Sequence, residues 1–311
     1  MIISVIGQGK LGKPISDVFS RFYKVIRLDK GDSFEKLGDI TFVVVPTPSV
    51  EGRFTSEFVE DVLSNINIHH QPVVIVSTLM PGETDRLQNE HPHLVLHYNP
   101  TFVALGSVAY DFTHQDFVLI GSKQKSIDKL LEIHTKIKSS RNTCIMSPLE
   151  AEIAKLTLNC YITTKITFAN QIGNLCHKLG INPKTILDSV GKDSRIGNKY
   201  FKAGLGYGGP CFPRDNVALS KFMEDNYYNP ELFRLIHKLN GKQVYEICDR
   251  VKAMNPKTVG FSGLSYKQGS DVEEESHLKK IWERLTSRGF ECKIGKGDVN
   301  LNWEGLNEKG I

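Results

Sequence analysis

The chain has 311 residues, enough for two or three domains, and 40% of them are hydrophobic, so a sizeable core can be buried. Its formal net charge of +4 is spread along the chain, which is too weak to indicate nucleic-acid binding and merely suits a small anionic ligand. No run of about 18 apolar residues is present, and the start MIISVIGQGKLG lacks the pattern of a signal peptide, so neither a membrane span nor secretion is expected.

Six cysteines are scattered along the chain, and no two of them form a CxxC pair. This spacing favours neither a zinc site nor a thioredoxin motif, and no metal site is predicted. A disulfide framework is also not expected in a chain of this length. The default setting is therefore a reducing, cytoplasmic one.

Strand and helix patterns alternate through the first 146 residues. Short apolar runs predict strands at Ile2–Ile6, Tyr23–Leu28, Ile40–Val45, Pro72–Ser77, Leu94–His97 and Phe117–Gly121. Helices are predicted at Lys10–Phe22, Ser56–Asn65 and Glu83–Asn89. This alternation predicts an α/β fold whose N-terminal domain, residues 1–146, is Rossmann-like, with a parallel sheet covered on both faces.

A long helix is predicted from residue 147 to 179, because neither proline nor a turn cluster interrupts the pattern after its first turn. Ser147 can cap this helix, Pro148 suits its first turn, and Glu150 can complete a capping box. Gly180 ends it. Such a helix would span about 50 Å, so it could bridge domains or pair with a second subunit. Two helices with an unnoticed break are the alternative.

The remaining pattern is mainly helical and ends in a short α/β segment. Helices are predicted at Pro183–Gly191, from about Pro213, at Glu231–Met254 and at Glu275–Arg288, with strands at Thr258–Gly263 and Phe290–Ile294. Residues 204–209 form the glycine-rich run GLGYGG. We therefore predict a helical central domain at 147–255 and a shortened C-terminal α/β segment at 256–311.

A GxGxxG motif follows the first strand and opens the first helix. Its residues are Gly7, Gln8, Gly9, Lys10, Leu11 and Gly12. The glycines allow a tight turn, a close approach of the backbone to a pyrophosphate, and packing of helix on strand. Asp29 lies 17 residues after Gly12, at the end of the second strand, where it can bind a ribose diol. This favours NAD over NADP, although the neighbouring Lys30 leaves the preference open, and a ligand-free glycine turn is the alternative.

Several further motifs occur in an order that resembles one enzyme family. They are GGPCFPRD at 208–215, EIAKLTLN at 152–159, RIGNKYFKAG at 195–204, VVPTP at 44–48, ST at 77–78, YNP at 98–100 and GLSYK at 263–267. Together they resemble the UDP-glucose/GDP-mannose dehydrogenase family, and within it the UDP-glucose 6-dehydrogenases, from residue 1 to about 295. The resemblance implies a nucleotide-sugar substrate, NAD as cofactor and at least a homodimer.

The resemblance also implies a two-step oxidation of a sugar C6 alcohol to a carboxylate, with Cys211 as the nucleophile. Hydride leaves readily from a thiohemiacetal but not from a bare aldehyde, so the second oxidation needs a thiolate. Cys211 precedes a proline-started helix, whose N-terminal dipole can lower a thiol pKa. An inert thiol is the alternative for Cys211 and the interpretation we give to the other five cysteines.

The resemblance assigns roles to further residues. Besides Cys211, the catalytic positions are Lys155 and Asn159 on one helix face, Asp215, Thr78 and Thr101. Cofactor contacts fall on the GxGxxG residues, Asp29, Lys30, Pro46, Thr47, Pro48, Ser77 and Thr78. Substrate contacts fall on Phe102, Lys155, Asn159, Arg195, Tyr200, Lys202, Tyr207, Gly208 and Lys267, with Arg195 expected to reach the substrate of a neighbouring subunit. Core packing is the alternative for the two tyrosines, a helix first-turn acid for Asp215, and a solvated helix face for the Lys155–Asn159 pair.

Three positions depart from the family pattern. Thr101 and Leu105 replace glutamates, and Glu274 replaces an arginine. A threonine hydroxyl can hold water but cannot act as a general base at neutral pH. Only 55 residues follow Pro256, too few for the full third domain of the family. Thioester hydrolysis is therefore predicted to be slow.

Two other functions remain open from the sequence. A β-hydroxyacid dehydrogenase would share a Rossmann domain followed by long helices, but it transfers one hydride without a cysteine. A non-catalytic protein that only binds the nucleotide sugar is the second. The sugar itself is also open among UDP-glucose, N-acetylmannosamine and GDP-mannose types.

Overall fold

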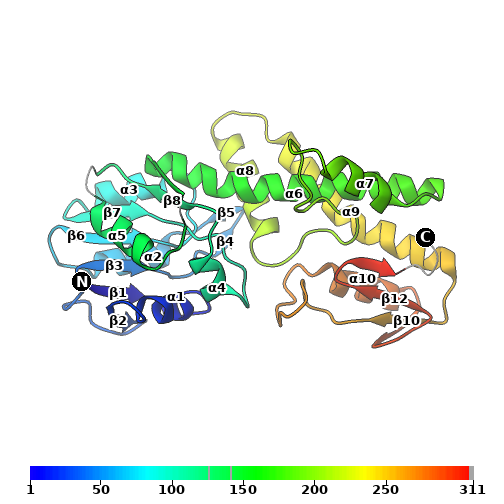
Figure 1. The fold of residues 1–311 in the computed structure, drawn as a ribbon, viewed down its shortest axis with the longest axis horizontal. Helices are drawn as coiled ribbons and strands as arrows, with labels where there is room; N and C mark the ends of the chain where they lie inside the picture. The colour runs from blue at the N-terminus through cyan, green and yellow to red at the C-terminus, as the bar shows by residue number, and fades with distance from the viewer. Residues whose placement is uncertain (125–126, 141, 308–311) are drawn as a thin grey trace. The chain divides into compact units, whose positions relative to one another are not determined.

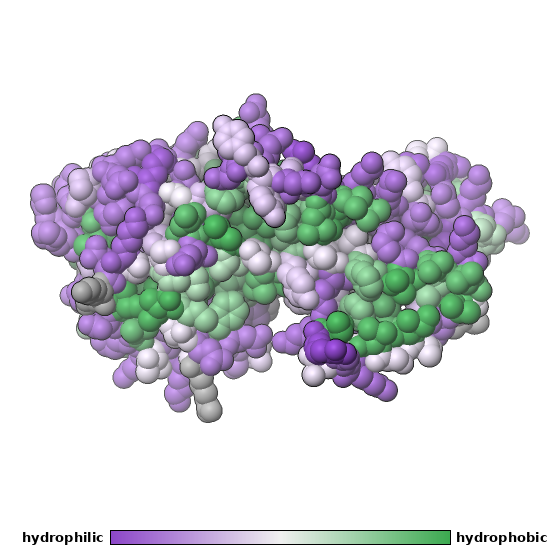
Figure 2. All heavy atoms as spheres, turned by 90° about the horizontal axis from the view of Figure 1, so that it is seen from above, coloured by the Kyte–Doolittle hydropathy of each residue, from purple (hydrophilic) through white to green (hydrophobic). Residues whose placement is uncertain are grey.

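The computed structural model describes residues 1–124, 127–140 and 142–307, and these form two compact units (Figure 1). The first unit is Met1–Lys155 and the second is Leu156–Ile311. The three-part division into 1–146, 147–255 and 256–311 stays a prediction. Hydrophilic side chains interrupted by apolar patches cover the face seen in Figure 2. Among the described residues, no helix combines the length and apolar character needed to cross a bilayer.

The first unit is built on a seven-stranded sheet in the order β2-β1-β3-β6-β7-β8-β9. Its strands are β1 (Ile2–Ile6), β2 (Lys24–Leu28), β3 (Ile40–Val43), β6 (Gln71–Ile75), β7 (Leu94–Tyr98), β8 (Val118–Gly121) and β9 (Thr143–Met146). A small hairpin, β4 (Ser49–Val50) with β5 (Arg53–Phe54), lies outside this sheet. The α/β fold predicted from the sequence is confirmed.

The predicted parallel sheet is present, and one pair of its strands is antiparallel. β8 runs antiparallel to β7, and the two meet only at Tyr98 and Gly121. The connection contains α4 (Val108–Thr113), a helix of six residues. The paired residues are the last of each strand, so β8 approaches from beyond the end of β7 and stops beside it.

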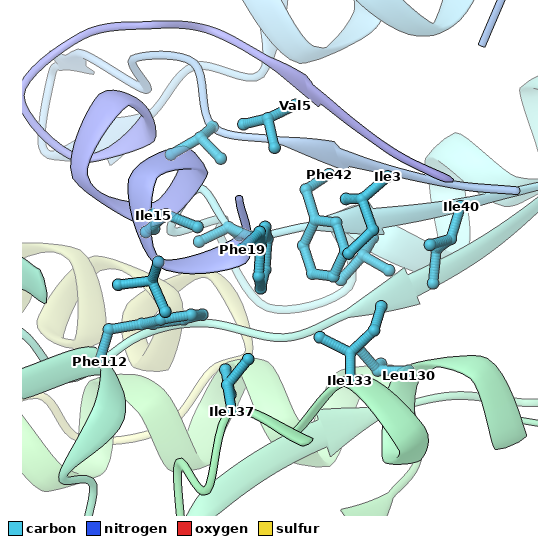
Figure 3. Packing of buried hydrophobic residues seen from close by; sticks show 14 of the residues in the cluster. Ile3, Val5, Ile15, Phe19, Ile40, Phe42, Phe112, Leu130, Ile133 and Ile137 are labelled. Atoms are coloured by element: carbon cyan, nitrogen blue, oxygen red, sulfur yellow. The ribbon is translucent and has the colours of Figure 1, made fainter. Parts of the chain in front are cut away.

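Two apolar cores lie on opposite faces of the sheet. One joins strand residues to α1 (Gly12–Phe19), α4 and α5 (Asp128–Lys136), and Figure 3 shows Phe19, Phe42 and Phe112 packed together there. The ring centroids of Phe19 and Phe42 are 4.8 Å apart. The other core contains α2 (Glu57–Ser64), α3 (Glu83–Glu90) and the first turn of α6. Burial on both faces explains why the strands read as continuous apolar runs.

A single helix, α6 (Pro148–Leu179), begins in the first unit and continues into the second. The predicted capping box is present, because the Ser147 backbone N–H and hydroxyl donate to Glu150 Oε2 at 2.9 and 2.6 Å. The Glu150 N–H donates back to Ser147 Oγ at 3.4 Å. The alternative of two helices with a break was wrong.

The second unit combines helices with a small sheet. Its helices after α6 are α7 (Pro183–Gly191), α8 (Phe212–Asp225), α9 (Glu231–Met254) and α10 (His277–Ser287). Its sheet has the order β11-β10-β12-β13, with β10 (Thr258–Phe261), β11 (Glu291–Ile294), β12 (Val299–Asn302) and β13 (Gly305–Asn307). Apolar residues of α9 and α10 pack on β10 and β12. The hairpin β12–β13 was not predicted from the sequence.

Candidate active site

Residues predicted to bind the cofactor follow adjacent parallel strands. The Gly7 turn follows β1, Asp29 follows β2, residues 46–48 come shortly after β3, and Ser77 with Thr78 come shortly after β6. The chain passes from β1 to β2 on one side and then to β3 on the other. The carboxyl ends of strands at such a switch point are where open α/β sheets bind nucleotides.

The three glycines of the turn differ in what surrounds them. A Cβ at Gly12 would lie 1.7 Å from the Gly7 carbonyl oxygen, and one at Gly7 would lie 2.5 Å from the Val44 oxygen. A Cβ at Gly9 would meet no described atom within 4 Å. Packing inside the protein therefore requires Gly7 and Gly12, whereas Gly9 leaves open space beside the backbone. Space at Gly9 fits a pyrophosphate that approaches from outside.

The start of α1 offers further donors to that position. Leu11 precedes this helix, and among the described residues no side chain caps its N-terminus. Uncapped N–H groups and the helix dipole favour an anion there. Asp29 Oδ2 accepts a hydrogen bond from the Gln8 N–H at 3.3 Å, and its Oδ1 accepts one from the Lys30 N–H at 2.9 Å. The carboxylate is thus fixed beside the glycine turn, with lone pairs left for a ribose diol.

The segments that follow β3 and β6 at this edge are joined by a hydrogen bond. Ser77 Oγ donates to the Val45 carbonyl at 2.6 Å, which joins the segment after β6 to the segment after β3. Thr47 and Ser77 are buried, Thr78 is half-buried, and Pro46 and Pro48 are exposed. The predicted cofactor residues of this edge are therefore brought together within the first unit.

Lys155 is a buried cation whose ammonium group has two defined contacts. It is 7% exposed, and its Nζ donates to the Thr101 carbonyl oxygen at 2.9 Å. The same ammonium lies 4.6 Å from the ring centroid of Phe102. Both partners follow β7, so the turn after that strand holds the charge by a carbonyl dipole and a cation–π contact. Three residues predicted separately, Lys155, Thr101 and Phe102, form one cluster.

Glu152, one helical turn before Lys155, anchors the start of α6 to α3. Its side chain is fully buried and accepts hydrogen bonds from Gly82 N at 2.6 Å, Thr84 N at 2.8 Å and Thr84 Oγ1 at 2.6 Å. Burial raises the pKa of Glu152 to about 7, although these hydrogen bonds lower it. The sequence motif contained this residue, but its partners are 68 and 70 positions away, so its role was missed.

A buried histidine holds the turn after β7. His134 Nε2 lies 2.8 Å from Asn99 Oδ1, and its Nδ1 lies 2.9 Å from Ser139 Oγ. Asn99 Nδ2 donates to the Leu119 carbonyl at 2.7 Å, so Asn99 Oδ1 accepts and His134 Nε2 carries the hydrogen. Burial lowers the pKa of His134 to about 4, so the ring is neutral. A neutral histidine thus fixes the segment that carries Thr101.

In the second unit, Cys211 is the residue before α8 and is exposed. The Asp215 N–H donates to the Cys211 carbonyl at 2.8 Å, and the Asn159 amide donates to Asp215 Oδ2 at 2.5 Å. Asp215 is 1% exposed and Asn159 is 8% exposed. The next residue, Asn216, donates to Thr163 Oγ1, one turn along α6 from Asn159. Two neighbouring polar pairs therefore fix the start of α8, and with it Cys211, on α6.

Aromatic rings flank the residue after Cys211. Phe212 lies 6.4 Å from both Tyr200 and Tyr207 by ring centroids, in edge-to-face geometry. Tyr200 is 51% exposed and has a φ of 60°, whereas Tyr207 is 3% exposed. Burial raises the pKa of the Tyr207 phenol, whose oxygen has no hydrogen-bond partner among the residues that the structure describes. The two predicted substrate tyrosines therefore lie on one aromatic cluster beside the thiol.

The GLGYGG segment is held by side-chain amides and leaves little room for side chains. Asn240 on α9 accepts from the Tyr207 N–H at 2.8 Å and donates to the Tyr207 carbonyl at 2.9 Å. A Cβ at Gly208 would lie 2.3 Å from the Glu275 oxygen, and one at Gly209 would lie 2.6 Å from the Tyr266 ring. Burial and the nearby Cys211 raise the pKa of Tyr266. Tyr266 is therefore a neighbour of the thiol to which the sequence gave no role.

The charged substrate candidates lie on the surface of the second unit. Arg195 is exposed and pairs with Asp193 through Nη2 at 2.7 Å. Lys202 is exposed, and Lys267 is half-buried with its Nζ 5.7 Å from the Tyr266 ring centroid. Exposed cations such as these are available to an anionic ligand. The predicted site residues therefore form two groups, one in each unit.

Comparison with known proteins decides the family. A model described as the NAD-binding domain of the UDP-glucose/GDP-mannose dehydrogenase family matches residues 35–138, and the central-domain model of that family matches residues 149–242. The chain belongs to the UDP-glucose/GDP-mannose dehydrogenase family. The first match begins after Gly12, so the assignment of the glycine turn depends on its geometry.

Family members with assigned activities are similar over most of this chain. UDP-glucose 6-dehydrogenase YwqF of Bacillus subtilis is 32% identical over 281 residues, which are 84% of this chain and 63% of that protein. UDP-glucose 6-dehydrogenase of Rickettsia bellii is 29% identical over 82% of this chain and 62% of that protein. The chain thus spans less than two thirds of the length of these two family members.

The fold also matches solved structures of the family. The UDP-glucose dehydrogenase from Pyrobaculum islandicum superposes with a TM-score of 0.85 at 25% identity, covering 94% of this chain and 81% of that chain. The family assignment disfavours the β-hydroxyacid dehydrogenase alternative. The departures from the family pattern at Thr101, Leu105 and Glu274 stay predictions. The backbone carbonyls of two of these residues accept hydrogen bonds near the predicted site. The Thr101 carbonyl accepts from Lys155 Nζ, and the Glu274 carbonyl accepts from the Gly209 N–H at 3.1 Å.

Proposed function

We propose that this protein oxidises the C6 alcohol of a nucleotide sugar to the carboxylate, with UDP-glucose as the substrate and NAD as the electron acceptor. The observation that carries the proposal is the exposed Cys211 at the start of α8, joined through Asp215 to Asn159. Bound NAD⁺ would supply the hydride acceptor for each oxidation, held by the glycine turn and Asp29.

Residues of this chain serve both oxidation steps. After the first hydride transfer, the Cys211 thiolate adds to the aldehyde, which forms a C–S bond and an alkoxide. The Lys155 ammonium and the Asn159 amide stabilise that oxygen, since donors fixed in place are most effective where charge develops. Loss of a second hydride leaves a thioester on Cys211. Water then adds to the thioester carbon, and the C–S bond breaks to release the acid and the thiolate.

The substrate-binding surface of the second unit suits a pyrimidine nucleotide. Tyr200 supplies a half-exposed ring to stack on a base, and Tyr207 with Phe212 supports it. Lys202 and Lys267 supply positive charge for the diphosphate. UDP-glucose is the substrate proposed first because the names of the similar curated proteins specify it.

We also propose that thioester hydrolysis is slow in this chain. The resemblance implies a water-activating glutamate at the position of Thr101, whose side chain cannot take a proton at neutral pH and whose carbonyl oxygen accepts a hydrogen bond from Lys155. The first oxidation and thioester formation do not need that glutamate. An acylated enzyme should therefore accumulate.

The test is the amount of NADH formed with UDP-glucose, UDP-N-acetylmannosamine and GDP-mannose in excess NAD⁺. We expect a burst of about one to two NADH per subunit with UDP-glucose, followed by slow turnover. Ordinary steady turnover with two NADH per sugar would contradict slow hydrolysis. No NADH with any sugar, combined with UDP binding by calorimetry, would instead support a protein that only binds nucleotides. Cys144→Ala is the matched control for Cys211→Ala, because both thiols are exposed.

A homodimer through α6 is part of the proposal. Four large apolar side chains at helical spacing on α6 are exposed, namely Tyr161 (60%), Phe168 (54%), Leu175 (52%) and Leu179 (62%). Such a stripe on a long helix suits a second copy of the chain, and an exposed Arg195 is compatible with contact to the substrate of a neighbour. Leu175→Glu should halve the mass measured by light scattering, whereas Leu232→Glu, an equally exposed leucine on α9, should not.

The cytoplasm is the proposed location. All six cysteines lie within the described residues and none of them forms a disulfide, which suits a reducing compartment. An exposed Cys211 outside any disulfide is also what the proposed chemistry needs. An increase in NADH-forming activity after treatment with a thiol reductant would support this assignment. Activity that does not respond to reductant, together with secretion of the protein, would contradict it.

A further inference from the structure

The hairpin β12–β13 ends in a tip that is shaped by one side chain. Asn302 Oδ1 accepts hydrogen bonds from the Glu304 N–H at 2.9 Å and the Gly305 N–H at 3.1 Å. Gly305 has a φ of 130°, which only glycine adopts readily. This turn projects Trp303 and the Glu304 carbonyl from the end of the hairpin in a fixed conformation.

The Trp303 ring contacts the segment that follows β10. Its Nε1 donates to the Ser265 carbonyl at 3.1 Å, and a Cβ at Gly263 would lie 2.9 Å from its ring. Ser265 Oγ in turn donates to the Lys267 carbonyl at 3.0 Å. Residues 263–267 therefore take their conformation from Trp303 on one side and from their own serine on the other.

The same tip contacts the start of the GLGYGG segment. A Cβ at Gly204 would lie 2.1 Å from the Glu304 carbonyl oxygen, and one at Gly305 would lie 3.2 Å from the Gly204 Cα. The Gly204 N–H is held by Asn170 Oδ1 at 2.8 Å, and its carbonyl is held by Gln243 Nε2 at 2.8 Å. The hairpin tip thus touches both segments, 204–209 and 263–267, which contain the predicted substrate residues Tyr207, Gly208 and Lys267.

We propose that Trp303 is a positioning residue for nucleotide binding, which braces residues 263–267 against residues 204–209 before the ligand arrives. This inference deepens the proposed function and rests on it. A segment that is held in its binding conformation loses less entropy when the ligand binds. Trp303 packs against the same apolar core as Trp282, and in addition it contacts Gly263 and donates to Ser265.

The chain offers a matched control, because it has only two tryptophans. Trp282 lies on α10 in the core of the same unit, 5.0 Å from Phe261 by ring centroids. Trp303→Phe keeps an apolar ring but removes the donor to Ser265. Trp282→Phe makes the same chemical change outside the hairpin and leaves Trp303 as a single fluorescent reporter.

Calorimetric titration with UDP alone tests the proposal. Trp303→Phe should bind UDP about threefold to tenfold more weakly than wild type, as expected for the loss of one hydrogen bond, and Trp282→Phe should bind like wild type. With active enzyme the loss should appear in KM and not in kcat. Equal UDP affinity of wild type and Trp303→Phe would overturn the proposal.

A second measurement separates this proposal from the proposed function. Amide hydrogen exchange of the ligand-free protein should be faster in residues 204–209 and 263–267 of Trp303→Phe than in wild type or Trp282→Phe. If wild type binds no UDP, the proposed function is overturned. The exchange rates would still test whether Trp303 positions the two segments. Unchanged exchange in both segments would overturn the proposal that Trp303 positions them, whether or not UDP binds.

Discussion

The substitution Glu152→Gln tests how the start of α6 is anchored. Glu152 is fully buried and accepts three hydrogen bonds from Gly82 and Thr84. Two effects on its pKa compete, because burial disfavours the charged carboxylate and the three donors favour it. Burial dominates, so the pKa rises from 4.5 to about 7.

The sign and size of the pH effect follow from this shift. Because the folded pKa lies above the unfolded one, the stabilisation from Glu152 is fully present below pH 4.5 and is lost as the pH rises through 7. A shift of about 2.5 pKa units corresponds to about 3 kcal/mol. Glutamine does not titrate, so the free-energy difference between wild type and Glu152→Gln should change by about 3 kcal/mol between pH 4.5 and 8, to the disadvantage of wild type.

Amide hydrogen exchange of β6 and β7, compared between the two proteins at each pH, measures this difference. Other titrating groups are common to both proteins and cancel. A constant difference in free energy between the two proteins is expected, because the glutamine NH₂ cannot accept a hydrogen bond from the Gly82 N–H. Only the change of this difference with pH therefore tests the pKa shift. A difference that stays flat, or that changes in favour of wild type as pH rises, would show that the donors outweigh burial and refute the reasoning.

Three further predictions follow from the first unit. Lys155→Met should lower kcat by about 10²–10³-fold in NADH assays, because the fixed cation is lost at the developing alkoxide; an unchanged kcat would remove Lys155 from the mechanism. Gly9→Ala should keep the fold and weaken NAD binding in calorimetry, whereas Gly12→Ala should lower the melting temperature, since its Cβ would lie 1.7 Å from a backbone oxygen; equal melting temperatures would contradict the packing. Burial lowers the pKa of His97 and His134 from 6.5 to about 4, so stability present above pH 6.5 should be lost as the pH falls through 4, by up to about 3 kcal/mol each; replacing His134 by glutamine should reduce this acid sensitivity in urea titrations.

Local signals in the sequence were sufficient for several elements. The long helix was predicted because Ser147 and Glu150 mark its start and nothing interrupts the pattern up to Gly180. The glycine turn was predicted because Gly7 and Gly12 fall between a strand and a helix. In each case the deciding residues are close together in sequence, so the pattern contains the physical cause.

Other features depend on contacts that no local pattern reveals. The direction of β8 depends on its pairing with β7 and β9, and β9 was missed because its four residues, Thr143–Met146, are too few to stand out. The hairpin with Trp303 has strands of four and three residues, too short to stand out.

In the candidate site, too, some features follow from local sequence signals and others depend on long-range contacts. Motifs placed Cys211 and Lys155, since their spacing is local to one helix or turn. The partners of Glu152 and the brace by Trp303 link residues 38 to 70 positions apart, so they required the structure.

The central claim is that Cys211 carries the sugar as a thioester, and acid quenching followed by peptide mass spectrometry tests it directly. After incubation with UDP-glucose and NAD⁺, the peptide that contains Cys211 should carry a glucuronosyl adduct that hydroxylamine removes and that does not form without NAD⁺. NADH formation with Cys211 unmodified, and a Cys211→Ala variant that still yields two NADH per sugar, would contradict the account.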